Sequence, residues 1–123
     1  MGHWSPPARI PFHVGVLRLQ VSVPGLGNAR GHQRAAQALK DRIRARHNVS
    51  CVLLVDPESS SSVVMVVTGA AADPMVLEQV LSRVSLLVNS DGRVIVHDEW
   101  RELRRGDHVE SMWASEEDAD DWR

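Results

Sequence analysis

The sequence predicts an α+β fold in which one four-stranded antiparallel sheet carries two helices on one face. Three observations support this prediction. Short runs of aliphatic and β-branched residues indicate strands, and two longer segments place apolar residues at helical spacing. These segments follow one another in the order strand, helix, strand, strand, helix, strand. The first strand has one polar side, so we expect the sheet to be covered on one face only. This combination is typical of the ferredoxin-like βαββαβ arrangement.

Four segments have the composition of strands. In the first, Leu17, Leu19 and Val21 share one side while Arg18 and Gln20 share the other. The second and third are aliphatic runs joined by a serine-rich loop, which favours a hairpin. The fourth follows a turn and carries Val94 and Val96 on one side in an alternating pattern. The expected strands cover residues 14–23, 49–56, 63–70 and 93–100.

Two segments have helical periodicity. The first covers residues 30–47 with Asn28 as its N-cap, and its apolar residues Ala36, Leu39 and Ile43 cluster on one side. The second begins at Asp73, followed by proline at the first helical position, which is a strong helix start. Both helices are therefore expected to pack an apolar side on the same sheet face. The apolar arc of the second comprises Val76, Leu77, Val80, Leu81, Val84, Leu87 and Val88.

Length and charge suggest one domain between two different ends. The 123 residues support a single hydrophobic core. We expect a proline-rich arm at residues 1–12, the domain at 13–105 and an acidic, disordered tail at 106–123. The chain has a net charge of −2, and the tail holds seven acids and one arginine, which leaves +4 on the remainder. The acids are Asp107, Glu110, Glu116, Glu117, Asp118, Asp120 and Asp121.

Nothing in the chain indicates a membrane or an oxidising compartment. No apolar run reaches the roughly 18 residues of a membrane span, and the N-terminal residues lack the apolar core of a signal peptide. The single cysteine, Cys51, alternates with aliphatic neighbours and is expected to be a buried, unreactive thiol. We therefore expect a cytoplasmic protein.

Two stretches resemble the bacterial YlxP-like family, small proteins classed as a domain of unknown function. They are VGVLRL at residues 14–19 and LKDRIRARHNVS at residues 39–50, with RIRARHNVS the most specific piece. With the second helix and final strand, the resemblance covers roughly residues 13–103. It implies a ferredoxin-like domain without a known cofactor. Family genes often lie beside translation initiation and ribosome-maturation genes, which implies a ribosome-linked role by association. Residues 28–34 and 57–62 depart from the family pattern.

The first helix holds the best candidate site. Its cations lie opposite its apolar side, as a polyanion site requires, because phosphate contacts give affinity independent of sequence. The alternative is an ordinary solvated surface, since arginine is a good helix former. The candidate anion- or RNA-binding residues are Arg30, Arg34, Lys40 and Arg44.

Other patterns indicate no catalytic or metal chemistry. The histidines lack helical metal-site spacing and Cys51 has no CxxC partner, so we expect surface histidines and no metal. The glycines at 25–31 match no phosphate-binding motif, and the serine run lacks a GxSxG context. Acids at 98, 99 and 102 have nothing to separate their pKa values. The open sheet face offers the first strand's polar side chains, which disfavours base stacking of the kind seen in RNA-recognition sheets.

These observations favour a non-enzymatic cytoplasmic accessory protein without a cofactor. It would contact ribosomal RNA or a ribosome-associated partner through the first helix, and the acidic tail could fold over that helix to weaken non-specific binding. The alternative is a homo-oligomeric structural or small-ligand-binding module with no nucleic-acid contact. A homodimer would form through the open sheet face or an edge strand.

Overall fold

Four strands and two helices make up the computed structural model, which describes residues 10–25, 29–55 and 61–106. The predicted N-cap Asn28, residues 1–9 of the arm and residues 107–123 of the acidic tail lie outside the described residues. In chain order the elements are β1 (His13–Ser22), α1 (Ala29–Arg46), β2 (Ser50–Val55), β3 (Val63–Ala71), α2 (Pro74–Asn89) and β4 (Ile95–Arg105).

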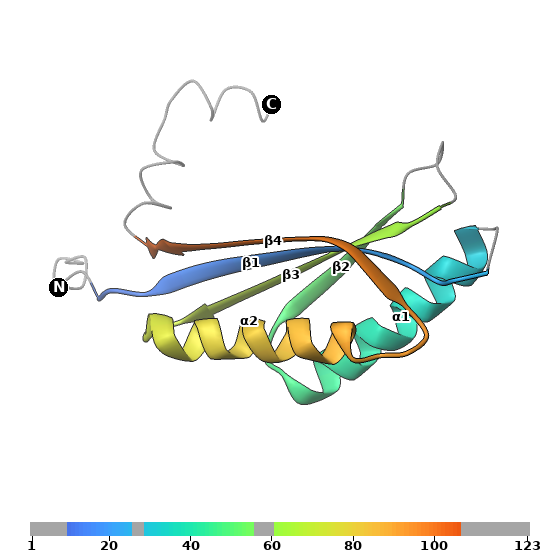
Figure 1. Ribbon diagram of the computed structural model, residues 1–123. Helices are drawn as coiled ribbons and strands as arrows, with labels where there is room; N and C mark the ends of the chain where they lie inside the picture. The colour runs from blue at the N-terminus through green and yellow to red at the C-terminus, as the bar shows by residue number, and fades with distance from the viewer. Residues whose placement is uncertain (1–9, 26–28, 56–60, 107–123) are drawn as a thin grey trace, which may run out of the picture.

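The strands form one antiparallel sheet in the order β2-β3-β1-β4, so β2 and β4 are its edges. Both helices lie against the same face, and no described helix covers the other (Figure 1). The ferredoxin-like arrangement predicted from the sequence is therefore confirmed, as is the β2–β3 hairpin. Residues that pair across the centre of the sheet, such as Leu17 with Val67, come from the alternating apolar positions of the sequence.

The core lies between the sheet and the helices. Leu17 and Leu19 of β1 are fully buried in the same cluster as Leu39 and Ile43 of α1, as the alternation in β1 and the periodicity of α1 predict. The predicted burial of Cys51 in β2 is also confirmed, at 5% exposure. The remaining buried apolar residues are Val21, Ala36, Val63, Met65, Val67, Leu77, Leu81, Val84 and Val88.

Three sequence expectations need correction. The last strand does not end at residue 100 but continues to Arg105, because β1 supplies a pairing partner along that whole length, down to His13. Val76 was expected in the apolar arc of α2 but is 49% exposed, since it lies at the edge of that arc, about 100° around the helix from the buried Leu77. His32 is no surface histidine: it is 3% exposed, and its Nδ1 accepts a hydrogen bond from the Val23 amide.

Candidate anion-binding site

Arg30 and Arg34 lie at a pocket between the first turns of α1 and the outer edge of the sheet. Its floor is formed by Leu53 and Val55 of β2, and its volume is about 430 Å³. The amide side chains Gln33 and Gln37 complete the lining. Because β2 is an edge strand, this pocket is bounded by a helix on one side only. The pocket therefore combines an apolar floor with a rim of guanidinium and amide donors.

Lys40 and Arg44 continue the same flank toward the other end of α1. Burial raises the pKa of the Cys51 thiol in β2, and the nearby charges of Lys40 and Arg44 oppose this shift with a smaller effect. Cys51 belongs to the same edge strand as the pocket floor. All four predicted cations thus lie on the side of α1 that faces β2, which we call the β2 flank.

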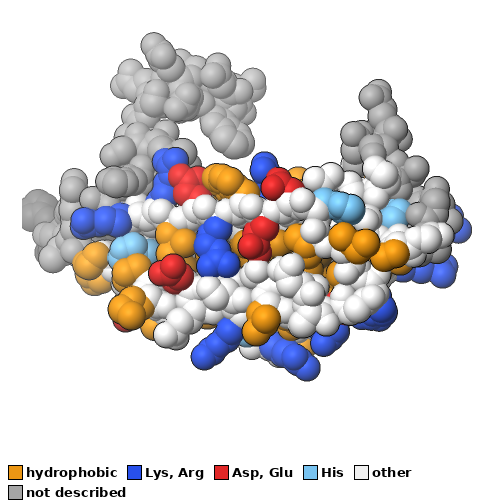
Figure 2. Space-filling model, viewed as in Figure 1, with side chains coloured by type: hydrophobic (Ala, Val, Ile, Leu, Met, Phe, Trp, Pro, Cys, Tyr) orange, Lys and Arg blue, Asp and Glu red, His pale blue; other side chains and the backbone are white. Residues whose placement is uncertain are grey.

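The cations of the β2 flank have no acidic partner among the described residues, where no ion pair involves any of them. Arg30, Arg34 and Arg44 are exposed, and Lys40 is half-buried. The acid nearest in sequence, Asp41, instead accepts a hydrogen bond from Gln37 at 3.0 Å. Unpaired cations retain their capacity for charge-assisted hydrogen bonds to an incoming anion. Lys and Arg side chains gather along the margin where α1 lies (Figure 2).

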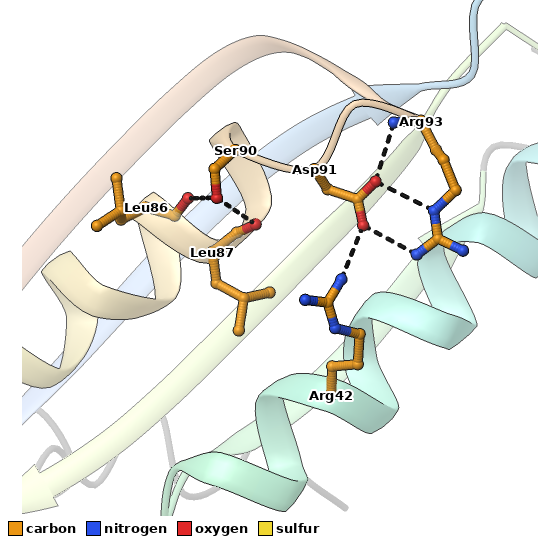
Figure 3. Close-up of polar contacts among 6 residues, drawn as sticks. All are labelled: Arg42, Leu86, Leu87, Ser90, Asp91 and Arg93. Carbon is orange, nitrogen blue, oxygen red and sulfur yellow. Dashed lines mark hydrogen bonds and ion pairs between the residues drawn. The ribbon is translucent and has the colours of Figure 1, made fainter.

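The opposite flank of α1 carries an arginine with a different role. Arg42 donates to the Asp91 carboxylate at 3.0 Å, and Arg93 donates to the same carboxylate through its side chain and backbone (Figure 3). The Asp91 side chain is only 4% exposed. Hydrogen bonds from Arg93 lower the pKa of Asp91 to about 2, with a smaller contribution from the charge of Arg42. This contact ties α1 to the turn after α2.

Two polar groups that sequence reasoning missed are His32 and Asp91. His32 sits on the buried side of α1, and its Nε2 has no hydrogen-bond partner among the described residues. Its position, four residues before Ala36 on the apolar side, was the available signal, because residues four apart share a helix face. Asp91 lies in a turn, where acids are common, so its local sequence carried no comparable signal.

The three acids near the end of the chain that were considered as a carboxylate set each contact a different polar side chain. Asp98 lies 3.7 Å from Arg18, Glu102 pairs with Arg104, and Glu99 accepts a hydrogen bond from Ser85. Within the described ranges, no cluster of three or more His, Cys, Asp or Glu side chains has the arrangement of a metal site. No helix in the described part of the chain combines the length and hydrophobicity needed to cross a membrane.

No protein-family model matches the sequence, and a comparison with curated proteins gave no significant match. Several solved structures resemble the fold at low sequence identity. The de novo designed protein Foldit4 is 13% identical, with a TM-score of 0.44 over 76% of this chain and 94% of that one.

Two natural proteins show similar likeness. SnoaB, a cofactor-independent oxygenase from Streptomyces nogalater, is 12% identical, with a TM-score of 0.42 over 75% of this chain and 90% of its own. PA3566 from Pseudomonas aeruginosa is 17% identical, with a TM-score of 0.43 over 84% of this chain and 96% of its own. These likenesses are too distant to indicate an activity.

Proposed function

We propose that this protein is a cytoplasmic accessory protein that binds RNA through the β2 flank of α1. The observation that carries the proposal is the set of four cations, Arg30, Arg34, Lys40 and Arg44, all on one flank and all without an acidic partner among the described residues. Their positions span 14 residues, which is about 21 Å of helix and long enough to follow several consecutive phosphates.

The apolar floor beside Arg30 and Arg34 favours single-stranded RNA over a duplex. Unstacked bases can lie against apolar surface or against guanidinium planes, whereas a paired helix keeps its bases stacked inside. Gln33 and Gln37 at the rim add donors and acceptors that can reach base edges. The resemblance to the YlxP-like family suggests that this single-stranded RNA is part of ribosomal RNA.

Binding is favoured over catalysis by the chemistry of the flank. Arginine and glutamine side chains neither attack a substrate nor exchange protons near neutral pH. The thiol of Cys51 is buried, and burial raises its pKa, which opposes a nucleophilic role. The residues that surround the pocket therefore hold an anion but offer no group that would transform it.

A second candidate function is the binding of a small amphipathic anion. The pocket of about 430 Å³ is within the usual size range for small-molecule sites, and its apolar floor beside two guanidiniums suits a carboxylate or phosphate with an apolar body. Such a ligand would need Arg30 and Arg34 but not Lys40 or Arg44. The two candidates therefore differ in how far along α1 the required charges extend.

The test is a salt titration of binding to ribosomal RNA and to purified small ribosomal subunits. Four phosphate contacts to a single strand predict that log Kobs falls with log salt at a slope of about −3. The variant R30E/R34E/K40E/R44E should lose binding at physiological salt while its circular dichroism spectrum stays that of the wild type. Binding by this folded variant with wild-type affinity would contradict the proposal.

A matched single substitution makes the test local. Arg34→Glu should weaken RNA binding and make the salt slope shallower, because it removes one phosphate contact. Arg83→Glu is the control, since Arg83 is also an exposed helical arginine but lies on α2, away from the β2 flank. Equal loss of affinity in both variants would indicate a general charge effect. If affinity is lost only when Arg30 or Arg34 is substituted, and Lys40 and Arg44 are dispensable, the result would favour binding of the small anion.

A further inference from the structure

The sheet face opposite the helices, which we call the open face, displays apolar side chains to solvent. Val52 and Leu54 of β2 are 50% and 54% exposed, and Ile95 and Trp100 of β4 are 46% and 43% exposed. Val64 and Val66 of β3, which alternate with buried core residues, lie beside the β2 side chains. Arg18 and Gln20 of β1 separate this apolar area over β2 and β3 from Ile95 and Trp100. An exposed apolar area of this kind is typical of an interaction surface.

The charges on the open face are paired with one another, unlike those on the β2 flank. Arg18 lies 3.7 Å from Asp98 and its guanidinium lies over the Trp100 ring at 5.5 Å from the centroid. Glu102 pairs with Arg104 beside them. Two basic and two acidic side chains leave this part of the face without net charge. It therefore offers no attraction to a polyanion or to the acidic segment at residues 107–123.

We propose that the open face pairs with the open face of a second copy of this chain. This inference is independent of the proposed RNA binding, because it uses the other side of the sheet. The pairing register places the side chains in two adjacent rows across the strands. One row consists of Val52, Val66, Arg18 and Trp100, and the next consists of Leu54, Val64, Gln20 and Asp98.

A two-fold axis across the strands, between these rows, makes the face self-complementary. It lays Val52 on the partner's Leu54, and Val66 on the partner's Val64, so apolar side chains meet apolar side chains. It also brings Arg18 next to the partner's Asp98, only one strand away, so opposite charges meet. An axis along the strands would instead place the apolar β2–β3 half over the charged β1–β4 half. The charge pattern therefore selects the first axis.

The size of the face suits a modest dimer. Four strands about 4.8 Å apart, with about 3.3 Å per residue, give roughly 500 Å² of flat area per copy, and projecting side chains increase the accessible area. Stable interfaces bury about 800 Å² per partner. We therefore expect the dimer to form with a dissociation constant in the micromolar range.

The test is the mass of the full chain in solution over a concentration series from about 1 to 200 µM, by sedimentation velocity. Wild type should shift from monomer to dimer within this range, and Leu54→Glu should remain monomeric. Leu86→Glu is the matched control, because it introduces the same leucine-to-glutamate change at an exposed position on α2, away from the open face. Leu86 is 67% exposed. Circular dichroism should show all three proteins folded.

A charge exchange tests the two-fold geometry. Arg18→Glu places an acid beside the partner's Asp98, and Asp98→Arg places a base beside the partner's Arg18, so each variant alone should dimerise at least tenfold more weakly. An equimolar mixture should restore dimers as heterodimers, because both contacts then join opposite charges.

Three results would overturn the proposal. The first is a wild type that stays monomeric at 200 µM, as expected if residues 1–9 or 107–123 of the same chain cover the face instead. The second is equal dimerisation of Leu54→Glu and Leu86→Glu. The third is a mixture of Arg18→Glu and Asp98→Arg that associates no better than either variant alone.

Discussion

The two flanks of α1 carry the same kind of side chain in opposite circumstances. On one flank, Arg42 contacts a carboxylate that is almost fully buried, that of Asp91. On the other, Arg44 and its neighbours Arg34 and Arg30 meet no acid among the described residues. Arg42 stabilises the contact between α1 and the turn after α2, whereas the unpaired cations are available to a ligand. The partner of a cation, and not its presence on a helix, therefore separates a structural charge from a binding one.

The largest expected effect on stability comes from removing the carboxylate that Arg42 contacts. Asp91→Ala should lower the free energy of unfolding by about 2–3 kcal/mol, because it removes a carboxylate that accepts hydrogen bonds from Arg42 and Arg93. Urea unfolding at pH 7 measures this change. Asp41→Ala, at an exposed acid on α1, should change the free energy of unfolding by no more than about 0.5 kcal/mol. Equal effects would show that the Asp91 contact adds no stability.

The pH dependence of stability should reveal the same carboxylate. The pKa of Asp91 is about 2 in the folded protein, against an ordinary value of 3.8, so the ionised form is favoured by folding. Its contribution is therefore fully present above pH 4–5 and is lost as the pH falls toward 2. The difference in unfolding free energy between wild type and Asp91→Ala should shrink over that window. A difference that stays constant down to pH 2 would contradict the low pKa.

A smaller effect is expected for the arginine of the same contact. Arg42→Gln should destabilise the protein by about 1 kcal/mol, because Asp91 keeps its bonds from Arg93 and the Arg42 side chain is 45% exposed. RNA affinity and its salt slope should be unchanged. A loss of RNA binding as large as that for Arg44→Gln would remove the distinction between the two flanks.

The smallest effect on stability is expected for a substitution on the β2 flank. Arg44→Gln should leave the unfolding free energy within about 0.5 kcal/mol of wild type, since the side chain is exposed and makes no ion pair with a described residue. The salt slope of RNA binding should become shallower by about 0.7, the loss of one single-strand phosphate contact. Urea unfolding and the salt titration together separate these outcomes, and an unchanged slope would exclude Arg44 from the interface.

Local patterns in the sequence were enough to predict the elements and most of the core. Alternation in β1 correctly assigned Leu17 and Leu19 to the covered face, and helical spacing did the same for Leu39 and Ile43. Local periodicity suffices here because each of these residues is buried by a whole layer, whichever element lies opposite. The shared side of the four α1 cations also follows from spacing along one helix.

What each side of α1 faces depends on how the strands and helices pack. The order β2-β3-β1-β4 puts the cations beside an edge strand, and that order depends on pairings between distant segments. The burial of Asp91 required the turn after α2 to meet α1, 49 residues away from Arg42 along the chain. Which residues share a face could therefore be predicted from local sequence, because that depends on backbone geometry over a few residues. The structure decided which charges are paired, because pairing depends on contacts between elements far apart in sequence.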